Sequence, residues 1–292
     1  MSIRRVASSA SKLALVVCSS FAVASIGGAA GIVPPANPAS NLAPHPNFLS
    51  SGSCSVTHVA QPCTNPCVSI VGRGSSLHIR FPAFTNETSC TRFVLRAINV
   101  ARSVEHLTPM VLPTNWYRLD ASEQLFVLAD LERTARGLPA YVGLNRSLTR
   151  AAQWAALRRV DPAVATGFAI GHDAQGVNGI ASTLALGFAT LEADYVWMYQ
   201  DGWGGSSATP NMACRSPGAP GCWGHRDQLL GFDGAYSAGV GLHCTTCEMG
   251  AGVAVVAGTG SMTDLIEVPA GKPPTMYFTW AKDVVPYLHP SG

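Results

Sequence analysis

The cysteines of this chain constrain its fold more than any other feature of the sequence. Nine are present, and setting aside Cys18 near the N-terminus leaves eight, in two groups of four on either side of the cysteine-free residues 91–213. The eight are Cys54, Cys63, Cys67, Cys90, Cys214, Cys222, Cys244 and Cys247. If the chain is exported, as its N-terminal residues predict below, an even number of cysteines indicates disulfides; we expect them mostly within each group, although the sequence does not choose among the pairings. The Cys-Thr-Thr-Cys spacing of the last two also fits a redox pair or half a zinc site, but an oxidising compartment favours a structural role.

The first thirty residues have the pattern of a secretory signal peptide. Arg4, Arg5 and Lys12 precede an apolar run over residues 13–23, and small residues follow. This pattern predicts export with residues 1–30 as the signal peptide. The apolar run is too short to cross a bilayer, and no later stretch is long enough without charges or breakers. We therefore expect a mature protein without a transmembrane segment, secreted or held in the cell envelope.

The charge balance argues against nucleic acid as a partner. Only 12% of the residues are charged and 47% are hydrophobic, which is the composition of a chain with a sizeable core. The formal net charge is +2, but three cations belong to the leader, so the remainder has 16 basic groups (19 minus 3) against 17 acidic ones. A chain without basic excess has little with which to neutralise phosphates.

Composition divides the rest of the chain into four parts. Residues 31–53 are rich in Pro, Ala, Asn and Ser, which predicts a linker. Residues 54–118 hold the first four cysteines and short alternating runs, which predicts a small disulfide-stapled N-terminal accessory region. The main domain is expected over residues 119–271, and residues 272–292 form a C-terminal tail.

The hydrophobic spacing predicts helices followed by strands. Helices are expected from Cys90 until Pro109, from the Asp120-Ala-Ser-Glu capping signal to Gly137, from Leu144 to Asp161, and over residues 183–199. Strands are expected over residues 237–243, 249–256 and 262–268. Between them, the Gly- and Pro-rich residues 202–221 predict a loop that Cys214 and Cys222 can pin. This order is that of an α+β domain.

Four segments in this order resemble the CAP superfamily of cysteine-rich secretory, antigen 5 and pathogenesis-related-1-like proteins, in particular its bacterial SCP-like branch. They are Leu-Glu-Arg-Thr-Ala-Arg-Gly-Leu-Pro at 131–139 with the alanine-rich 144–153, Val-Asn-Gly-Ile-Ala at 177–181, Ala-Asp-Tyr-Val-Trp-Met at 193–198, and Gly-His-Arg-Asp-Gln-Leu-Leu-Gly at 224–231 with Val-Gly-Leu at 240–242. The resemblance covers about residues 120–268. It implies an α-β-α sandwich of CAP type with a central cleft.

The resemblance also implies a site. Many members of the family place two histidines and two carboxylates in the cleft, a set that can hold a divalent metal such as zinc. The last histidine corresponds to His225, and His172 is the candidate for the first. The acids are replaced by Asn178 and Gln200. Because amides do not ionise, these four residues predict a hydrogen-bonding ligand cleft with a degraded tetrad.

Two nearby acids can replace the missing carboxylates, and they lead to an alternative function. Asp201 follows Gln200 directly, and Glu192 lies about two helical turns earlier. Our first expectation is an extracellular binding or interaction module for a small-molecule, lipid or cell-wall ligand. The alternative is a cell-envelope hydrolase of peptide or cell-wall polymer that uses His225 with Asp201 or Glu192, and a second alternative is a hydrophobic-ligand carrier.

Each of these residues also has a purely structural interpretation. His225 can instead hydrogen-bond the neighbouring loop backbone, and His172 can be an ordinary loop histidine. Arg226 and Asp227 can form an ordinary surface ion pair, which contributes little on its own. The sequence has no Walker segment and no His-Glu-x-x-His, and it lacks the glycine spacing of a nucleophile elbow at Ser261.

Overall fold

The computed structural model describes residues 36–42, 69–71, 78–80, 88–160, 181–183, 190–204, 211, 213–230, 247–256, 259–267 and 275–288. The predicted signal peptide, most of the predicted linker, and Cys54, Cys63, Cys67 and Cys244 lie outside these residues. Among the described helices, none combines the length and apolarity that crossing a bilayer requires.

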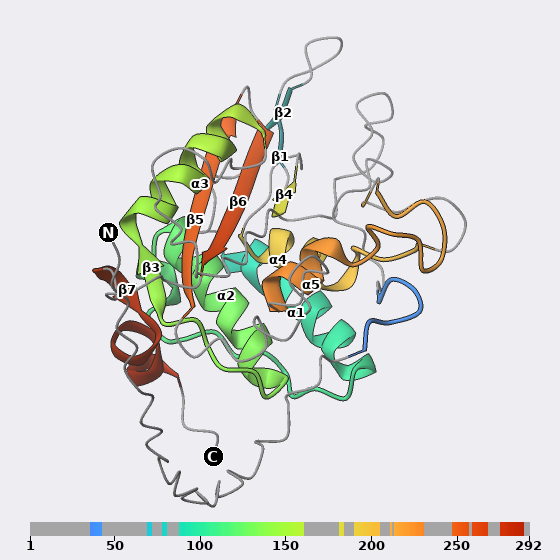
Figure 1. The fold of residues 1–292 in the computed structure, drawn as a ribbon, viewed down its shortest axis with the longest axis horizontal. Helices are drawn as coiled ribbons and strands as arrows, with labels where there is room; N and C mark the ends of the chain where they lie inside the picture. The colour runs from blue at the N-terminus through green and yellow to red at the C-terminus, as the bar shows by residue number, and fades with distance from the viewer. Residues whose placement is uncertain are drawn as a thin grey trace, which may run out of the picture. The chain divides into compact units, whose positions relative to one another are not determined.

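A five-stranded mixed sheet forms the centre of the fold (Figure 1). Its strands, in spatial order, are β4 (Ala181–Thr183), β6 (Thr259–Glu267), β5 (Glu248–Val256), β3 (Gly143–Asn145) and β7 (Met276–Thr279). The pairing of β3 with β5 is parallel, and the other three pairings are antiparallel. A separate antiparallel pair is formed by β1 (Ser69–Val71) and β2 (His78–Arg80).

The helices and the sheet together make an α+β fold, as predicted. The helices are α1 (Thr88–Val104), α2 (Ala121–Ala135), α3 (Arg146–Arg158), α4 (Thr190–Tyr199) and α5 (Gly224–Leu230). Three short helical turns add η2 (Trp116–Arg118), η4 (Trp280–Val284) and η5 (Val285–Tyr287).

The starts of α2 and α3 are encoded locally. Asp120 accepts a hydrogen bond from the backbone N–H of Glu123, whose carboxylate accepts one from the backbone of Asp120, so the predicted capping signal forms a complete capping box. Asn145 caps α3 without a reciprocal contact: its side chain accepts from the N–H groups of Ser147 and Leu148. Arg159, in the left-handed conformation, ends α3.

Two glycines let α3 lie directly on the sheet (Figure 1). Gly250 and Gly252 are two residues apart on β5, so they lie on the same face. A Cβ on Gly250 would overlap the backbone of Leu148, and one on Gly252 would overlap the backbone of Ala152. The absence of side chains at these two strand positions therefore sets how closely the helix approaches the strand.

The other face of β5 and β6 belongs to the main core. Met249, Ala251, Met262 and Ile266 join one buried cluster with apolar side chains from α1, α2 and α4. Helices thus cover both faces of the two long strands, because the residues of each strand alternate between α3 and this core.

The core also extends past the sequence-based boundaries. Val94 and Ile98 on α1, within the predicted accessory region 54–118, are fully buried in the same cluster as α2 and α4. Phe278 on β7, within the predicted tail 272–292, is buried there too and forms an edge-to-face contact with Phe126 on α2. Residues on both sides of the predicted main domain therefore complete its core and its sheet.

Several elements differ from their predictions. The helix expected over residues 183–199 was placed too early, because α4 begins at Thr190 and Thr183 pairs with Met262 as part of β4. The strands at 249–256 and 262–268 correspond to β5 and β6, whereas 237–243 lies outside the described residues. The short elements β3, β7 and α5 were not predicted.

Candidate functional site

The candidate site lies where the end of α4 meets the start of α5. Asp201 follows α4 by two residues, and its carboxylate binds His225 twice. One oxygen accepts a hydrogen bond from the backbone N–H of His225 at 2.8 Å, and the other lies 2.6 Å from the ring Nδ1. The carboxylate side chain is 1% exposed, whereas the imidazole side chain is 26% exposed. A buried acid therefore holds a histidine that reaches solvent.

This contact determines the protonation pattern of the imidazole. With the carboxylate ionised, Nδ1 is the donor in the 2.6 Å contact, because an ionised carboxylate only accepts hydrogen bonds. In the neutral ring Nε2 is then the basic nitrogen, and the carboxylate stabilises the imidazolium that forms when Nε2 takes up a proton. The pair can thus accept and return a proton.

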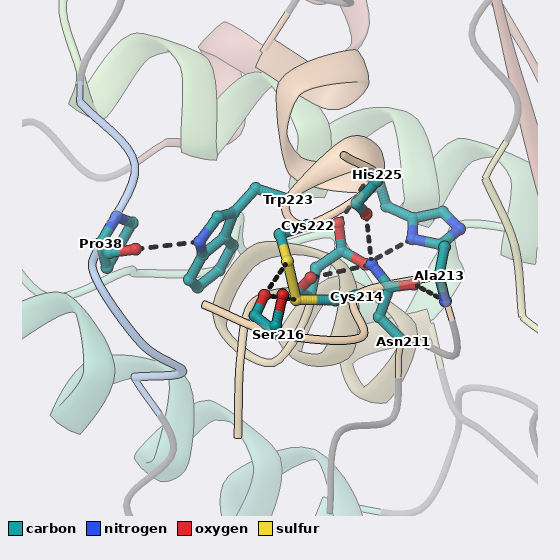
Figure 2. Close-up of a disulfide and its surroundings, with 10 residues drawn as sticks. Pro38, Asn211, Ala213, Cys214, Ser216, Cys222, Trp223 and His225 are labelled. Atoms are coloured by element: carbon teal, nitrogen blue, oxygen red, sulfur yellow. Dashed lines mark hydrogen bonds and ion pairs between the residues drawn. A yellow bond between two sulfur atoms is a disulfide. The ribbon is translucent and has the colours of Figure 1, made fainter. Parts of the chain in front are cut away.

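A disulfide-pinned loop holds the backbone of this site (Figure 2). Cys214 and Cys222 form a disulfide, as predicted for the loop over residues 202–221. Asn211 donates its amide hydrogens to the carbonyls of Asp201 and Gly221, each at 2.8 Å, so it joins the residue that orients the histidine to the end of the loop. Figure 2 shows the imidazole of His225 directed away from Pro38.

Trp223 connects Asp201 to Pro38. Its backbone N–H donates to the carbonyl of Asp201 at 2.9 Å, and its indole N–H donates to the carbonyl of Pro38 at 2.9 Å (Figure 2). Its backbone has φ of 65°, a conformation that only a strong context imposes on a tryptophan. A Cβ on Gly202 would overlap the indole, so glycine is required there for the ring to pack.

Helix α5 has only seven residues, and buried side chains anchor it along its length. Arg226 is fully buried, pairs with Glu105, and donates to the carbonyl of Met198 at 2.6 Å. At the other end, the carbonyls of Leu229 and Leu230 accept from Tyr141 and Arg133, respectively. These contacts fix the helix that carries His225.

A buried charge cluster connects α1, α2 and α4. Glu132 accepts from Arg102 at 2.7 Å, from Arg136 and from the hydroxyl of Tyr199 at 2.7 Å. Burial alone would raise the pKa of Glu132, but the charges of Arg136 and Arg102 and these hydrogen bonds lower it. Glu132 therefore stays ionised in the interior.

Asp194, one helical turn before Met198 on α4, has the opposite character. Burial, followed by the nearby charge of Glu132, raises its pKa well above the usual range, although Arg102 and Arg136 act in the other direction. Neither of its carboxylate oxygens has a hydrogen-bond partner among the described residues. The folded state thus favours the protonated form of this carboxyl more than the unfolded chain does.

The structure places some of the predicted site residues and omits others. His172 and Asn178 lie outside the described residues. Glu192 on α4 and Gln200 just after it are both buried. Of the two acids proposed to serve His225, Asp201 is the one whose contact with the imidazole is described.

The described residues do not complete a metal site. No group of three or more His, Cys, Asp or Glu side chains among them is arranged to hold a metal ion. Both oxygens of Asp201 are engaged by His225, so this acid orients the imidazole and is not poised as a ligand itself. The zinc set with His172 and His225 remains a prediction.

One sequence-based interpretation is wrong. Arg226 and Asp227 do not form a surface pair: Arg226 is buried against Glu105, and Asp227 accepts a hydrogen bond from the side chain of Asn37 at 2.8 Å. Adjacent residues on a helix point in different directions, so neighbouring opposite charges have no reason to meet. Because Glu105 and Arg226 are far apart in the chain, no local sequence pattern predicts that they pair.

The described cysteines support structural disulfides. The Cys214–Cys222 bond falls within the second group, as expected. Cys247, immediately before β5, is buried and also disulfide-bonded, so it is neither a free thiol nor a zinc ligand. Cys90 lies on α1.

Sequence reasoning missed Asn211 and Glu105, which connect the site to distant segments. Asn211 sits in a Pro-Asn-Met loop that carries no chemical signature, and Glu105 directly follows a helix.

Comparison of the chain with family models, with curated proteins and with solved structures finds no match in any of the three.

Proposed function

We propose that this chain is an exported hydrolase of the cell envelope, built on a CAP-like α-β-α sandwich, in which His225 acts as general base and then as general acid. The observation that carries the proposal is the 2.6 Å contact of its Nδ1 with the buried carboxylate of Asp201. The substrate class is a peptide or a cell-wall polymer, which an exported protein meets outside the cytoplasm.

The contact supports an acid–base function because of its asymmetry. Asp201 is almost fully buried and binds both the ring and the backbone of His225, so the orientation of the imidazole is restrained. The ring itself is partly exposed, which allows water and substrate to approach. In hydrolysis, the neutral imidazole would take a proton from the attacking water and return it to the leaving group.

The same contact favours hydrolysis over the binding module expected first. That expectation depended on the replacement of both family carboxylates by Asn178 and Gln200. Asp201 supplies a carboxylate at the histidine from the position directly after Gln200. An amide at position 200 therefore does not deprive His225 of an acid partner.

Purified protein should release soluble fragments from isolated peptidoglycan or from casein. His225→Ala removes the acid–base group and is expected to lower kcat by about 10²–10⁴-fold. Asp201→Asn should have an effect of similar order, because the amide can donate to Nδ1 and impose the other tautomer. The measurement is the initial rate of fragment release, with circular dichroism to establish that each variant is folded.

Asp227→Asn is the matched control, since it changes an acid on the same helix whose carboxylate accepts a hydrogen bond from Asn37. It should leave the rate unchanged. If the wild-type protein retains the polymer without cleaving it, and His225→Ala abolishes that retention, the chain is a binding module and the hydrolase proposal is wrong.

A further inference from the structure

The outward side of α3 combines arginines with exposed apolar side chains. Its inward side, with Leu148, Ala152, Ala155 and Ala156, is buried. Its outward side carries Arg146, Arg150, Trp154, Leu157 and Arg158, all of them exposed. At about 100° per residue, these five lie within a face roughly 120° wide, which we call the α3 outer face.

The apolar part of this face is large for a surface helix. Trp154 is 48% exposed and Leu157 is 50% exposed, and Val160, just beyond the helix, is 43% exposed. Single exposed apolar residues are common, but here three occur within seven positions. Their removal from water would favour association with another apolar phase.

The charge of the segment has a single sign. Residues 141–160 contain Arg146, Arg150, Arg158 and Arg159 but neither Asp nor Glu, although the whole chain has 19 basic and 17 acidic residues. Asp120 and Glu123 interact electrostatically with Tyr277, so acidic groups border the face near Arg146. Away from this border, Arg150 and Arg158 are exposed on the face, and Asp161 is the next acid along the chain.

The arginines are combined with aromatic rings. The guanidinium of Arg158 lies 4.2 Å from the centre of the Trp154 ring, and that of Arg146 lies 4.8 Å from the centre of the Tyr277 ring. Such a pair presents an apolar body together with a planar donor that binds phosphate. Tryptophan, tyrosine and arginine are the residues that favour the boundary between lipid headgroups and acyl chains.

We propose that the α3 outer face docks in the plane of an anionic lipid surface. The arginines would bind lipid phosphates, while Trp154, Leu157 and Val160 enter the boundary beneath the headgroups. A soluble polyanion would satisfy the arginines but would leave these apolar side chains in water, so the combination favours lipid. The docking is peripheral and reversible, because the inner side of α3 remains packed on β5 and β6.

Co-sedimentation tests this with vesicles of phosphatidylcholine alone and with vesicles in which phosphatidylglycerol makes up about a third of the lipid. The protein should bind the anionic vesicles, and raising the salt concentration should weaken the binding. Arg150→Gln/Arg158→Gln should weaken it by about 25-fold, at about five-fold per arginine. Some binding should persist at high salt because it depends on apolar contact. Trp154→Ala should remove this salt-resistant binding.

The matched control is Tyr117→Ala/Arg118→Gln, which removes an exposed aromatic residue and an exposed arginine from η2. It should bind as the wild-type protein does. Equal binding to neutral and anionic vesicles, or full binding by the arginine double variant, would overturn the proposal. Binding of soluble polyphosphate without binding of vesicles would overturn it as well, in favour of an anionic polymer.

Discussion

Arg226 shows how one buried side chain connects three helices. Its guanidinium pairs with Glu105 beyond α1, donates to Met198 on α4, and lies 5.4 Å from the centre of the Trp223 ring. Because it adjoins His225 in sequence, its contacts also restrain the residue that we propose to be catalytic. Its role there is positioning, since it acts through α5.

Replacing this arginine tests its contribution. Arg226→Gln leaves Glu105 with Arg136 as its remaining described ion-pair partner, at 2.5 Å, and strips Met198 of a charged donor. We expect the free energy of unfolding to fall by about 3 kcal/mol, the lower end for a broken buried pair. Chemical denaturation measures this.

Arg215→Gln is the control, because Arg215 is exposed in the disulfide loop, and it should change stability by less than about 0.5 kcal/mol. A loss no larger than the control's would mean that α5 is held by its other anchors.

At the scale of elements, the distance between α3 and β5 depends on the glycines of β5, which have no side chain between the strand and the helix. A Cβ on Gly252 would meet main-chain atoms of Ala152. Main-chain atoms cannot rotate aside as the end of a long side chain can. By contrast, an exposed loop glycine can accept a methyl group at little cost. Helix–strand distance in this protein is therefore sensitive to one carbon atom.

Gly252→Ala should separate α3 from the sheet. Its Cβ would overlap main-chain atoms, so the helix must shift, and we expect a loss of about 1–3 kcal/mol in the free energy of unfolding. Gly224→Ala is the matched control, because an added Cβ there meets no atom within 4 Å. Urea denaturation compares the two, and equal stabilities would show that α3 adjusts without cost.

For the whole molecule, buried carboxyls predict how stability depends on pH. Burial raises the pKa values of Asp130 and Asp194 well above their usual range. Between their unfolded value of about 3.9 and these higher folded values, the folded state holds more protons than the unfolded state. Its stability therefore falls as the pH rises through this range.

Glu132 acts in the opposite sense. Its folded pKa is lowered, so the stability that it contributes is present above its unfolded value of about 4.3 and is lost as the pH falls through the folded value. The two effects together place the highest stability in mildly acidic solution. The wild-type free energy of unfolding should be larger near about pH 4.5 than near about pH 7.5.

Asp194→Asn isolates one of these groups. It replaces a desolvated carboxyl with a neutral amide of similar size, so we expect a gain of about 1–3 kcal/mol at neutral pH and a flatter pH dependence. Urea denaturation at both pH values measures this. A wild-type stability that rises over the range, or a variant that is less stable at neutral pH, would contradict the assignment.

The local sequence predicts some of the fold well. The capping box of Asp120 and Glu123 and the cap at Asn145 define the starts of α2 and α3, because each satisfies backbone donors within three residues. Short runs separated by glycines likewise indicate β5 and β6. Strands of three or four residues, such as β3 and β7, carry too little pattern to be predicted, since their pairing partners lie far away in the chain.

The residues of the candidate site were available from the sequence, but their arrangement was not. His225, Asp201 and Glu192 were all candidates, and the Cys214–Cys222 bond was one of several possible pairings. Tertiary packing decided that Asp201 meets the imidazole and that Arg226 binds Glu105, 121 residues away. Caps and alternation depend on neighbours along the chain, whereas these contacts depend on how four helices and the sheet pack together, which no short segment encodes.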